Sequence, residues 1–343
     1  MPFKIIRNDI SKVKADAIVN SANSEPVAGS GCEGAIYEAA GKELLLEARR
    51  KIGRIEQGGA AATAAFGLNA KYIIHTVGPV WIDGKHGERG VLEACYGNSL
   101  RLAEELGCES VAFPLISGGN CGFPKGTAVE AAVDAIGRFL RASEMKVTLV
   151  VLSRKALEIS ERLTEGVERF IDENAADEII SKEYVRNLNY RAVLAGRRER
   201  DDFIASESDP PAAGTLYSLS GKTLDEILVD KEDSFRARLF KLMDEKKIGD
   251  VEFYKKANID RKVFSRMRVK EDYKPTKMTA LASAIALELD LPATADLLAR
   301  AGIALSPSSK FDLIVSYFIM HGDYDINKIN TVLFKYGQPA IGC

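Results

Sequence analysis

The chain has 343 residues, of which 46% are hydrophobic and 28% charged, and its formal net charge is −2. This composition is typical of a globular protein with enough length for two domains, and so small a net charge does not by itself imply a polyanionic partner. No apolar run approaches the roughly 20 residues that cross a bilayer, and residues 1–7 lack the apolar core of a signal peptide, so we expect a cytoplasmic protein without membrane contact.

The five cysteines and three histidines are widely separated. An odd number of scattered cysteines fits reduced thiols better than a disulfide framework, and no pair stands at the spacing of zinc ligands. We therefore expect no bound metal and no cofactor.

Residues 1–175 alternate short apolar runs with helical periodicity, which predicts an α/β domain with a largely parallel or mixed sheet. Strands are expected at 3–6, 17–19, 60–65, 72–77, 110–115 and 146–152, and helices at 90–106, 125–141 and 156–174. Residues 176–222 are predicted to be a connector, with a helix at 178–195 followed by a linker rich in Ser, Pro and Gly.

From residue 223 onward every periodic segment is helical, which predicts a separate all-α domain over 223–343. Its helices are expected at 234–247, 251–257, 261–268, 276–289, 293–301, 310–320 and 325–334.

Two glycine-rich loops follow predicted strands. Residues 18–23 (Ile-Val-Asn-Ser-Ala-Asn) lead into the first loop, with Gly29, Gly31 and Gly34, and then into an alanine-rich helix. Residues 117–124 (Ser-Gly-Gly-Asn-Cys-Gly-Phe-Pro) connect another strand to the helix that begins at Lys125. One such loop could be an ordinary turn. Two of them, each placing backbone N–H groups at a helix N-terminus, suit the two phosphates of a diphosphate.

Five segments in this order make residues 1–175 resemble a macro domain, a module that binds ADP-ribose; they are residues 8–10, 18–23, 29–41, 74–79 and 117–124. Within that family the chain is similar to hydrolases that act on O-acetyl-ADP-ribose and on mono-ADP-ribosylated carboxylates. The resemblance implies a three-layer α/β/α fold with a mixed sheet. It also implies ADP-ribose, O-acetyl-ADP-ribose or an ADP-ribosylated protein as the ligand.

The resemblance further implies roles for single residues. Asp9, beside Ile10, would accept a hydrogen bond from the adenine amino group, Asn23 would bind the distal ribose and Phe123 would lie against it, while Asn20 would stabilise the loop. Without the resemblance, Asp9 could simply cap a turn and Phe123 could be a core residue. Both phosphates would be bound by the loops, through Gly31, Cys32, Gly34, Ser117, Gly118, Gly119, Asn120, Cys121 and Gly122.

Glu33 is the residue on which the predicted chemistry depends. The resemblance implies Asp here, since many hydrolytic relatives have a Val-Asp-Gly sequence at this point, whereas this chain has Cys32-Glu33-Gly34. We predict that Glu33, with Asn23, positions the attacking water, although a misplacement of about 1 Å can lower a rate about 100-fold. The alternative is that Glu33 only favours the helix N-terminus, by about 0.3 to 1 kcal/mol, in a non-catalytic ADP-ribose reader. Cys32 and Cys121 could form a redox-sensitive pair or, in the simpler interpretation, pack as small buried thiols.

Residues 251–268 predict a helix, a turn and a second helix, and residues 234–302 resemble the phage-repressor type of helix-turn-helix. Residues 255–277 carry nine basic and three acidic residues, a local charge of +6. The resemblance implies that the module binds DNA, with the base edges faced by Arg261, Lys262, Ser265 and Arg266. The alternative is a helical bundle for protein contacts or dimerisation, with a solvated basic face.

Overall fold

In the computed structural model, residues 2–119, 121–152, 164–173 and 234–342 are described. Within them, six strands form one sheet in the order β1-β6-β5-β2-β4-β3. Neighbouring strands are parallel, except that β3 and β4 are antiparallel, so the predicted mixed sheet is confirmed. The strands, each within two residues of its predicted ends, are β1 (Phe3–Arg7), β2 (Ala17–Ser21), β3 (Ala60–Ala64), β4 (Tyr72–Thr76), β5 (Ser110–Pro114) and β6 (Lys146–Val151).

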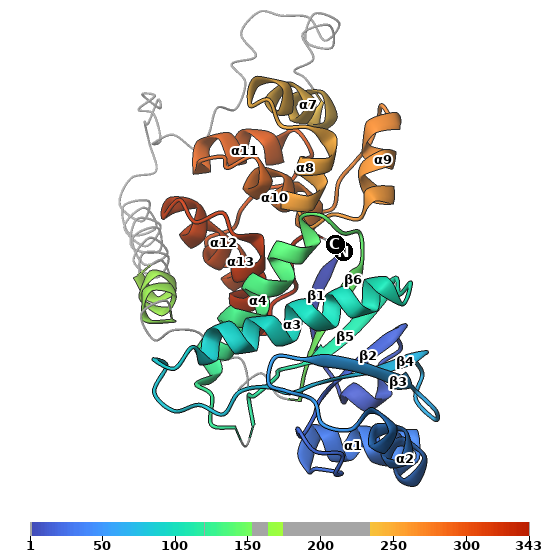
Figure 1. The fold of residues 1–343 in the computed structure, drawn as a ribbon. Coiled ribbons are helices and arrows are strands. Elements are labelled where there is room, and N and C mark those ends of the chain that lie inside the picture. Colours follow the sequence, from blue (N-terminus) through green and yellow to red (C-terminus); the bar gives the residue numbers. More distant parts are fainter. Residues whose placement is uncertain (1, 120, 153–163, 174–233, 343) are drawn as a thin grey trace, which may run out of the picture.

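Helices cover both faces of this sheet (Figure 1). Val19 faces a core formed with α3 (Glu88–Glu105) and α4 (Lys125–Leu140). Its neighbour Ile18 faces the opposite core, with α1 (Gly31–Ala40), α2 (Lys42–Ile52) and the short 3-10 helix η1 (Ile10–Lys12). Successive residues of a strand point to opposite faces, so a strand covered on both sides has a continuous apolar sequence. The predicted α/β/α layers are therefore present.

Residues 234–342 form an all-α module with a core of its own. Its helices follow the predicted ones closely: α7 (Phe235–Glu245), α8 (Asp250–Lys256), α9 (Arg261–Val269), α10 (Lys277–Ala286), α11 (Leu291–Ala299), α12 (Lys310–Met320) and α13 (Ile326–Lys335). Most begin at a Ser, Thr or Asp whose side chain accepts a backbone N–H of the first turn, as Asp260 does from Lys262. In the described residues, no helix of the chain is both long and apolar enough to cross a membrane.

Residues 164–173 are helical, which agrees with part of the helix expected at 156–174. Their contacts are with the all-α module: Val167 belongs to its core, Phe170 packs edge to face on Tyr317 at 5.6 Å, and Thr164 accepts a hydrogen bond from Lys335. We had expected this helix to complete the α/β domain. The rest of it, the helix at 178–195 and the linker lie outside the described residues.

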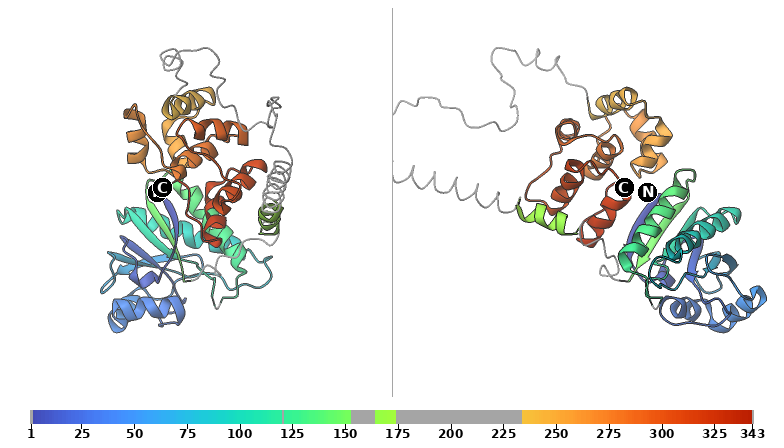
Figure 2. Two further views of the ribbon diagram at one scale, coloured as in Figure 1. Left: turned by 180° about the vertical axis from the view of Figure 1, so that it is seen from behind. Right: turned by 60° about the vertical axis from the view of Figure 1, so that its left-hand side comes forward.

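The α8–α9 turn joins the two domains at the outer edge of β1. Asn258 is buried, and its side-chain amide accepts from Phe3 N at 3.2 Å and donates to Phe3 O at 3.0 Å. Nearby, Tyr254 donates to Glu144 at 2.8 Å. An exposed edge strand has unpaired N–H and C=O groups, and here Asn258 makes the pair of bonds that a neighbouring strand would make. The module consequently lies against the β1 side of the sheet (Figure 2).

Candidate functional site

The two glycine-rich loops lie side by side because β2 and β5 are adjacent and parallel, with Ala17 opposite Val111. Parallel neighbours end at the same edge of the sheet, so both loops leave from that edge. The chain then enters α1 on one face and α4 on the other. In open α/β sheets a crevice opens where neighbouring strands connect to opposite faces, and ligands bind there.

Positive φ angles shape both loops: Gly31 has φ +62°, Ser117 +58° and Gly122 +69°. Gly31 opens α1, and a Cβ there would meet no other atom within 4 Å. In the second loop, Gly118 donates its N–H to Leu115 O and Gly122 to Gly119 O, both at 3.2 Å. In this structure these two N–H groups bond within the loop. Asn120 lies outside the described residues.

Asp9 is placed beside the first loop by η1. Its Oδ1 accepts from Ser11 N at 3.0 Å and from Ser11 Oγ at 2.8 Å, so it caps η1, while Ile10 is buried beneath it. Burial, with the negative charges of Asp9 and Glu33, raises the pKa of the Cys32 thiol to about 12. The structure thus brings Asp9, Cys32 and Glu33 together at the N-terminus of α1. A thiol of such high pKa is mostly protonated and fits the packing interpretation of Cys32.

Glu33 lies beneath Asn23, which is exposed. The carboxyl group of Glu33 is buried; Oε2 accepts from Asn23 Nδ2 at 2.8 Å, and Oε1 accepts from Asn23 N and Asn20 Nδ2 at 3.3 Å each. Burial raises the pKa of this carboxyl group, whereas the hydrogen bonds from Asn23 and Asn20 and the charge of Arg49 oppose the rise. A Cβ at Gly29 would overlap Glu33 Oε2, so the longer side chain depends on a glycine at that position.

Arg49 of α2 is the cationic residue of this site, and neither Arg49 nor its helix is predicted from the sequence. It is 1% exposed, and its guanidinium group donates to the carbonyl oxygens of Gly53, Asn23 and Ser24. The only sequence signal was its position four residues after the buried Leu45, on the inner side of a highly charged helix. Arg49 holds the backbone that carries Asn23 and provides a positive charge near Glu33.

Behind Glu33, a chain of buried polar side chains crosses three strands. Asn20 Nδ2 also lies 3.2 Å from His75 Nδ1, and His75 Nε2 lies 3.0 Å from Thr63 Oγ1. Burial, assisted by the charge of Arg49, lowers the pKa of His75 to about 3, so the imidazole is neutral at ordinary pH. The expected loop-stabilising role of Asn20 fits these contacts. His75 and Thr63 had been given no role.

In the second loop, Phe123 and Cys121, both expected to contact the ligand, make contacts with Trp81. Phe123 is 3% exposed and packs edge to face against Trp81, with ring centroids 4.7 Å apart, which matches core packing, the other interpretation of this residue. Cys121 accepts a hydrogen bond from Trp81 N through its carbonyl oxygen. Cys32 and Cys121 are both free thiols.

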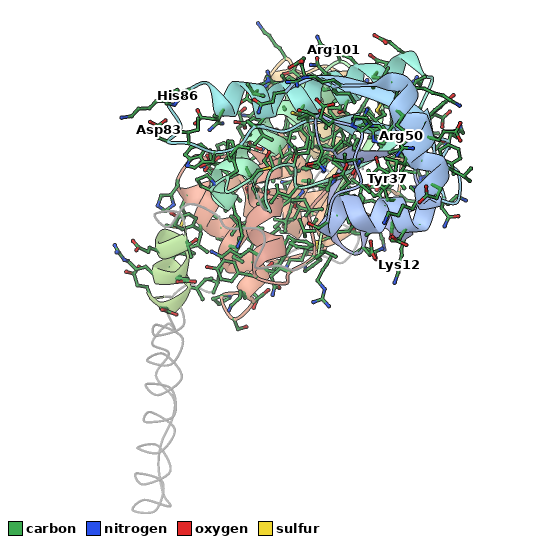
Figure 3. The ribbon with its side chains drawn as sticks, turned by 60° about the horizontal axis from the view of Figure 1, so that its bottom comes forward. Lys12, Tyr37, Arg50, Asp83, His86 and Arg101 are labelled. Carbon is green, nitrogen blue, oxygen red and sulfur yellow. The ribbon has the colours of Figure 1, made fainter. Side chains whose placement is uncertain are left out.

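In the described part of the chain, one cluster offers metal-ligand atoms within 4.8 Å of one another: Asp83, His86 and Glu88. Glu88 is the first residue of α3, and Figure 3 shows Asp83 and His86 in the loop before it. Glu88 is buried, and its two oxygens accept the backbone N–H groups of Ile82, Asp83, Gly84 and His86. The backbone N–H of Glu88 itself, with those of Gly84, Asp83 and His86, lowers the pKa of Glu88 to about 2, although its burial opposes this. These bonds give Glu88 a structural role in shaping the loop.

The basic residues of the helical module are not part of the loop site. Arg261, Lys262, Ser265 and Arg266 are all exposed on α9, next to the α8–α9 turn. The turn contacts β1 at its amino end, whereas the two loops lie at the carboxyl ends of β2 and β5. The chain therefore has two separate candidate surfaces.

Comparison with known proteins agrees with this fold. A family model described as "Macro domain" matches residues 19–132. The O-acetyl-ADP-ribose deacetylase of Citrobacter rodentium is 44% identical over 164 residues, which are 46% of this chain and 93% of that protein. The deacetylase of the same name from Escherichia fergusonii is 46% identical over 139 residues, covering 40% of this chain and 78% of that one. Through its α/β domain, the chain belongs to the macro-domain family.

Solved structures are similar as well. The Oceanobacillus iheyensis macrodomain with MES bound is 34% identical, with a TM-score of 0.43, and the match covers 45% of this chain and 85% of that one. The Trypanosoma brucei macrodomain in complex with ADP-ribose is 29% identical, with a TM-score of 0.42, over 45% and 66% of the two chains.

Proposed function

We propose that the α/β domain binds ADP-ribose and hydrolyses the ester between its distal ribose and an acyl group, in O-acetyl-ADP-ribose or in an ADP-ribosylated Asp or Glu side chain. The observation that carries the proposal is the position of the two glycine-rich loops, side by side at the carboxyl ends of β2 and β5 and each leading into a helix. The names of the two deacetylases, which are more than 40% identical to the domain, support the same substrate class.

The diphosphate would lie across the N-termini of α1 and α4, because backbone N–H groups and the helix dipoles favour anions there. Gly31 and Cys32 would contribute from the first loop, where the N–H of Gly34 instead bonds to Ser30 O at 3.5 Å, and Ser117 and Gly119 from the second. Adenine would lie toward Asp9, whose second carboxylate oxygen can accept its amino group while Oδ1 caps η1.

The distal ribose would then lie over Asn23, with Glu33 below it. Water adds to the acyl carbon, the bond from that carbon to the ribose oxygen breaks, and the products are ADP-ribose and a free carboxylic acid. A buried carboxylate with a raised pKa is suited to accept the proton from the attacking water. The reaction consumes only water, so the proposal includes no metal or other cofactor.

A non-catalytic reader is the second candidate, and the contacts of Glu33 favour it. A carboxylate has about four acceptor positions, and Glu33 already accepts from Asn23 N, Asn23 Nδ2 and Asn20 Nδ2. The backbone N–H of Gly29 also lowers its pKa. If these bonds persist with ligand present, Glu33 orients Asn23 toward the ribose and takes no proton.

A turnover assay on O-acetyl-ADP-ribose and on a mono-ADP-ribosylated carboxylate separates the two candidates. For a hydrolase, Glu33→Gln lowers kcat about 100-fold or more while ADP-ribose affinity in calorimetry changes little. Micromolar ADP-ribose binding without turnover, together with turnover by Glu33→Asp, would identify a reader.

In either case, a role of the helical module in binding DNA remains our proposal for its basic surface. The exposed cations of α9 adjoin a groove of about 630 Å³ at the amino ends of the strands. Its charged lining residues are Lys4, Lys14, Lys71, Lys146, Asp260 and Asp16, and Asp16 pairs with Lys71 at 2.9 Å. Binding of the full chain to a mixed pool of DNA duplexes should weaken steeply with salt, because phosphate contacts release counterions. Absent or salt-independent binding would favour the protein-contact alternative.

A further inference from the structure

Three polar side chains lie behind Glu33, on neighbouring strands: Asn20 on β2, His75 on β4 and Thr63 on β3. All are buried, with exposed fractions of 0%, 0% and 8%. Asn20 and His75 are register partners, whereas Thr63 is diagonal to His75, two residues beyond its partner Ala61. Side chains related in these ways lie on one face of a sheet, within reach of each other.

The direction of each hydrogen bond in this row follows from Glu33. The carboxylate only accepts, so the Asn20 atom 3.3 Å from Glu33 Oε1 has to be the amide nitrogen. The same nitrogen lies 3.2 Å from His75 Nδ1, which therefore accepts. A neutral imidazole with an accepting Nδ1 carries its proton on Nε2, and this N–H donates to Thr63 Oγ1 at 3.0 Å. Asn20 therefore donates in both directions, to Glu33 and to His75, and His75 in turn donates to Thr63.

Asn20 depends on this arrangement. Its Oδ1 is buried and has no hydrogen-bond partner among the described residues, so the amide is held in place by the two bonds from Nδ2. Turning the amide over would place Oδ1 against the carboxylate oxygen, which is repulsive. If His75 could not accept, one of the two bonds would be lost and the amide would be free to turn away from Glu33.

We propose that His75 and Thr63 are positioning residues for Glu33: Thr63 holds the Nε2–H tautomer of His75, and His75 holds the Asn20 N–H on the carboxylate. The role of this row in catalysis rests on the hydrolase function proposed above. The effect of the row on the carboxyl group of Glu33 is independent of that function. Glu33 is also faced by Arg49 of α2, Tyr37 of α1 and, through Cys32, Asp9 of η1, all of which the test leaves in place.

The test uses the full chain with Thr63→Val, which keeps the branched shape in the strand but removes the acceptor for His75. Thr63→Ser is the matched control because it retains a hydroxyl group. Two quantities are measured: the titration of the Glu33 carboxyl carbon by NMR, and kcat and KM on O-acetyl-ADP-ribose.

In Thr63→Val the pKa of Glu33 should shift upward, because the Asn20 hydrogen bond that lowers it is weakened. The value of kcat should fall about tenfold with KM nearly unchanged, since the acyl group is bound but Glu33 is misplaced. Thr63→Ser should match the unmodified chain in both measurements.

An unchanged Glu33 titration in Thr63→Val overturns the proposal, and so does a shifted titration with full kcat in an active enzyme. If the unmodified chain has no turnover, the hydrolase function fails, and the titration alone then decides whether the row acts on Glu33. If Thr63→Val does not fold, the same comparison is made with His75→Gln, which retains a polar side chain.

Discussion

In the helical module, three buried hydroxyl groups bond to the backbone of their own helix or its approach. Ser283 donates to Thr279 O, Thr294 to Leu289 O and Thr331 to Asn327 O. In the α/β domain, by contrast, the buried polar side chains at the end of β2 bond to one another across elements far apart in sequence. Hydrogen bonds from a side chain to the backbone of its own helix satisfy local polar groups and require no ligand.

The network at the end of β2 buries charge, which is unfavourable unless each charged group is compensated. Here the charges are compensated by position: the carboxylate of Glu33 lies near the charge of Arg49, and the buried His75 is neutral. The difference teaches that burial of polar groups does not by itself mark a site in this protein. At the end of β2, burial is combined with long-range hydrogen bonds beside an exposed residue, Asn23.

The largest expected effect tests whether ligand binding belongs to the α/β domain alone. Gly31→Glu places a carboxylate at the first phosphate loop, on a residue with φ +62°, and should weaken ADP-ribose binding in calorimetry at least ~100-fold, or about 2.7 kcal/mol. Gly31→Ala carries the backbone strain without the charge and should retain more affinity. Unchanged affinity in Gly31→Glu would remove the phosphate-site assignment.

The contact between the two regions should have the next largest effect. Asn258→Gly keeps the left-handed conformation of the turn (φ +50°) but removes both hydrogen bonds to Phe3, and should reduce the free energy of unfolding by about 2 kcal/mol. Asn258→Ala adds backbone strain and should lose about 1 kcal/mol more. Urea unfolding measures both. A loss below about 0.5 kcal/mol in both variants would mean that these bonds do not hold the domains together.

The buried network should make stability depend on pH. The pKa of His75 is lowered from 6.5 to about 3 in the folded chain, so below pH 6.5 the unfolded chain binds a proton that the folded chain does not. Stability is therefore full above pH 6.5 and is lost as the pH falls toward 3, by about 2 kcal/mol at pH 5. His75→Gln should flatten this part of the profile. An equally steep profile in the variant would assign the acid sensitivity to another group.

The smallest effect is expected for a local bond in the helical module. Ser283→Ala removes a hydroxyl group that bonds to Thr279 O within α10, and should change the free energy of unfolding by less than about 1 kcal/mol, with no effect on ADP-ribose binding. Differential scanning calorimetry of thermal unfolding measures this change in stability. A loss of about 2 kcal/mol, the size expected for Asn258→Gly, would contradict the local character of this bond.

Much of the fold could be predicted from the sequence because its signals are local. Alternation, apolar runs and a helix N-cap such as Asp260 depend on residues a few positions apart, and the strands and module helices follow them. Hydrophobic periodicity did not predict α2, because the buried residues of this helix are Leu45 and the charged Arg49. Periodicity also could not show that residues 164–173 pack on the helical module, since the same apolar face fits either core.

The sequence by itself determined the two glycine-rich loops, the asparagines before the first of them and the presence of Glu33 at the start of α1. Only the tertiary structure decided that β2 and β5 are neighbours, and that Glu33 turns inward under Asn23 to meet Asn20 and the charge of Arg49. Strand order and the surroundings of a carboxylate are set by contacts between residues far apart in the chain. No local pattern in the sequence encodes these contacts. In this protein they decide whether Glu33 activates water or only holds Asn23 in place.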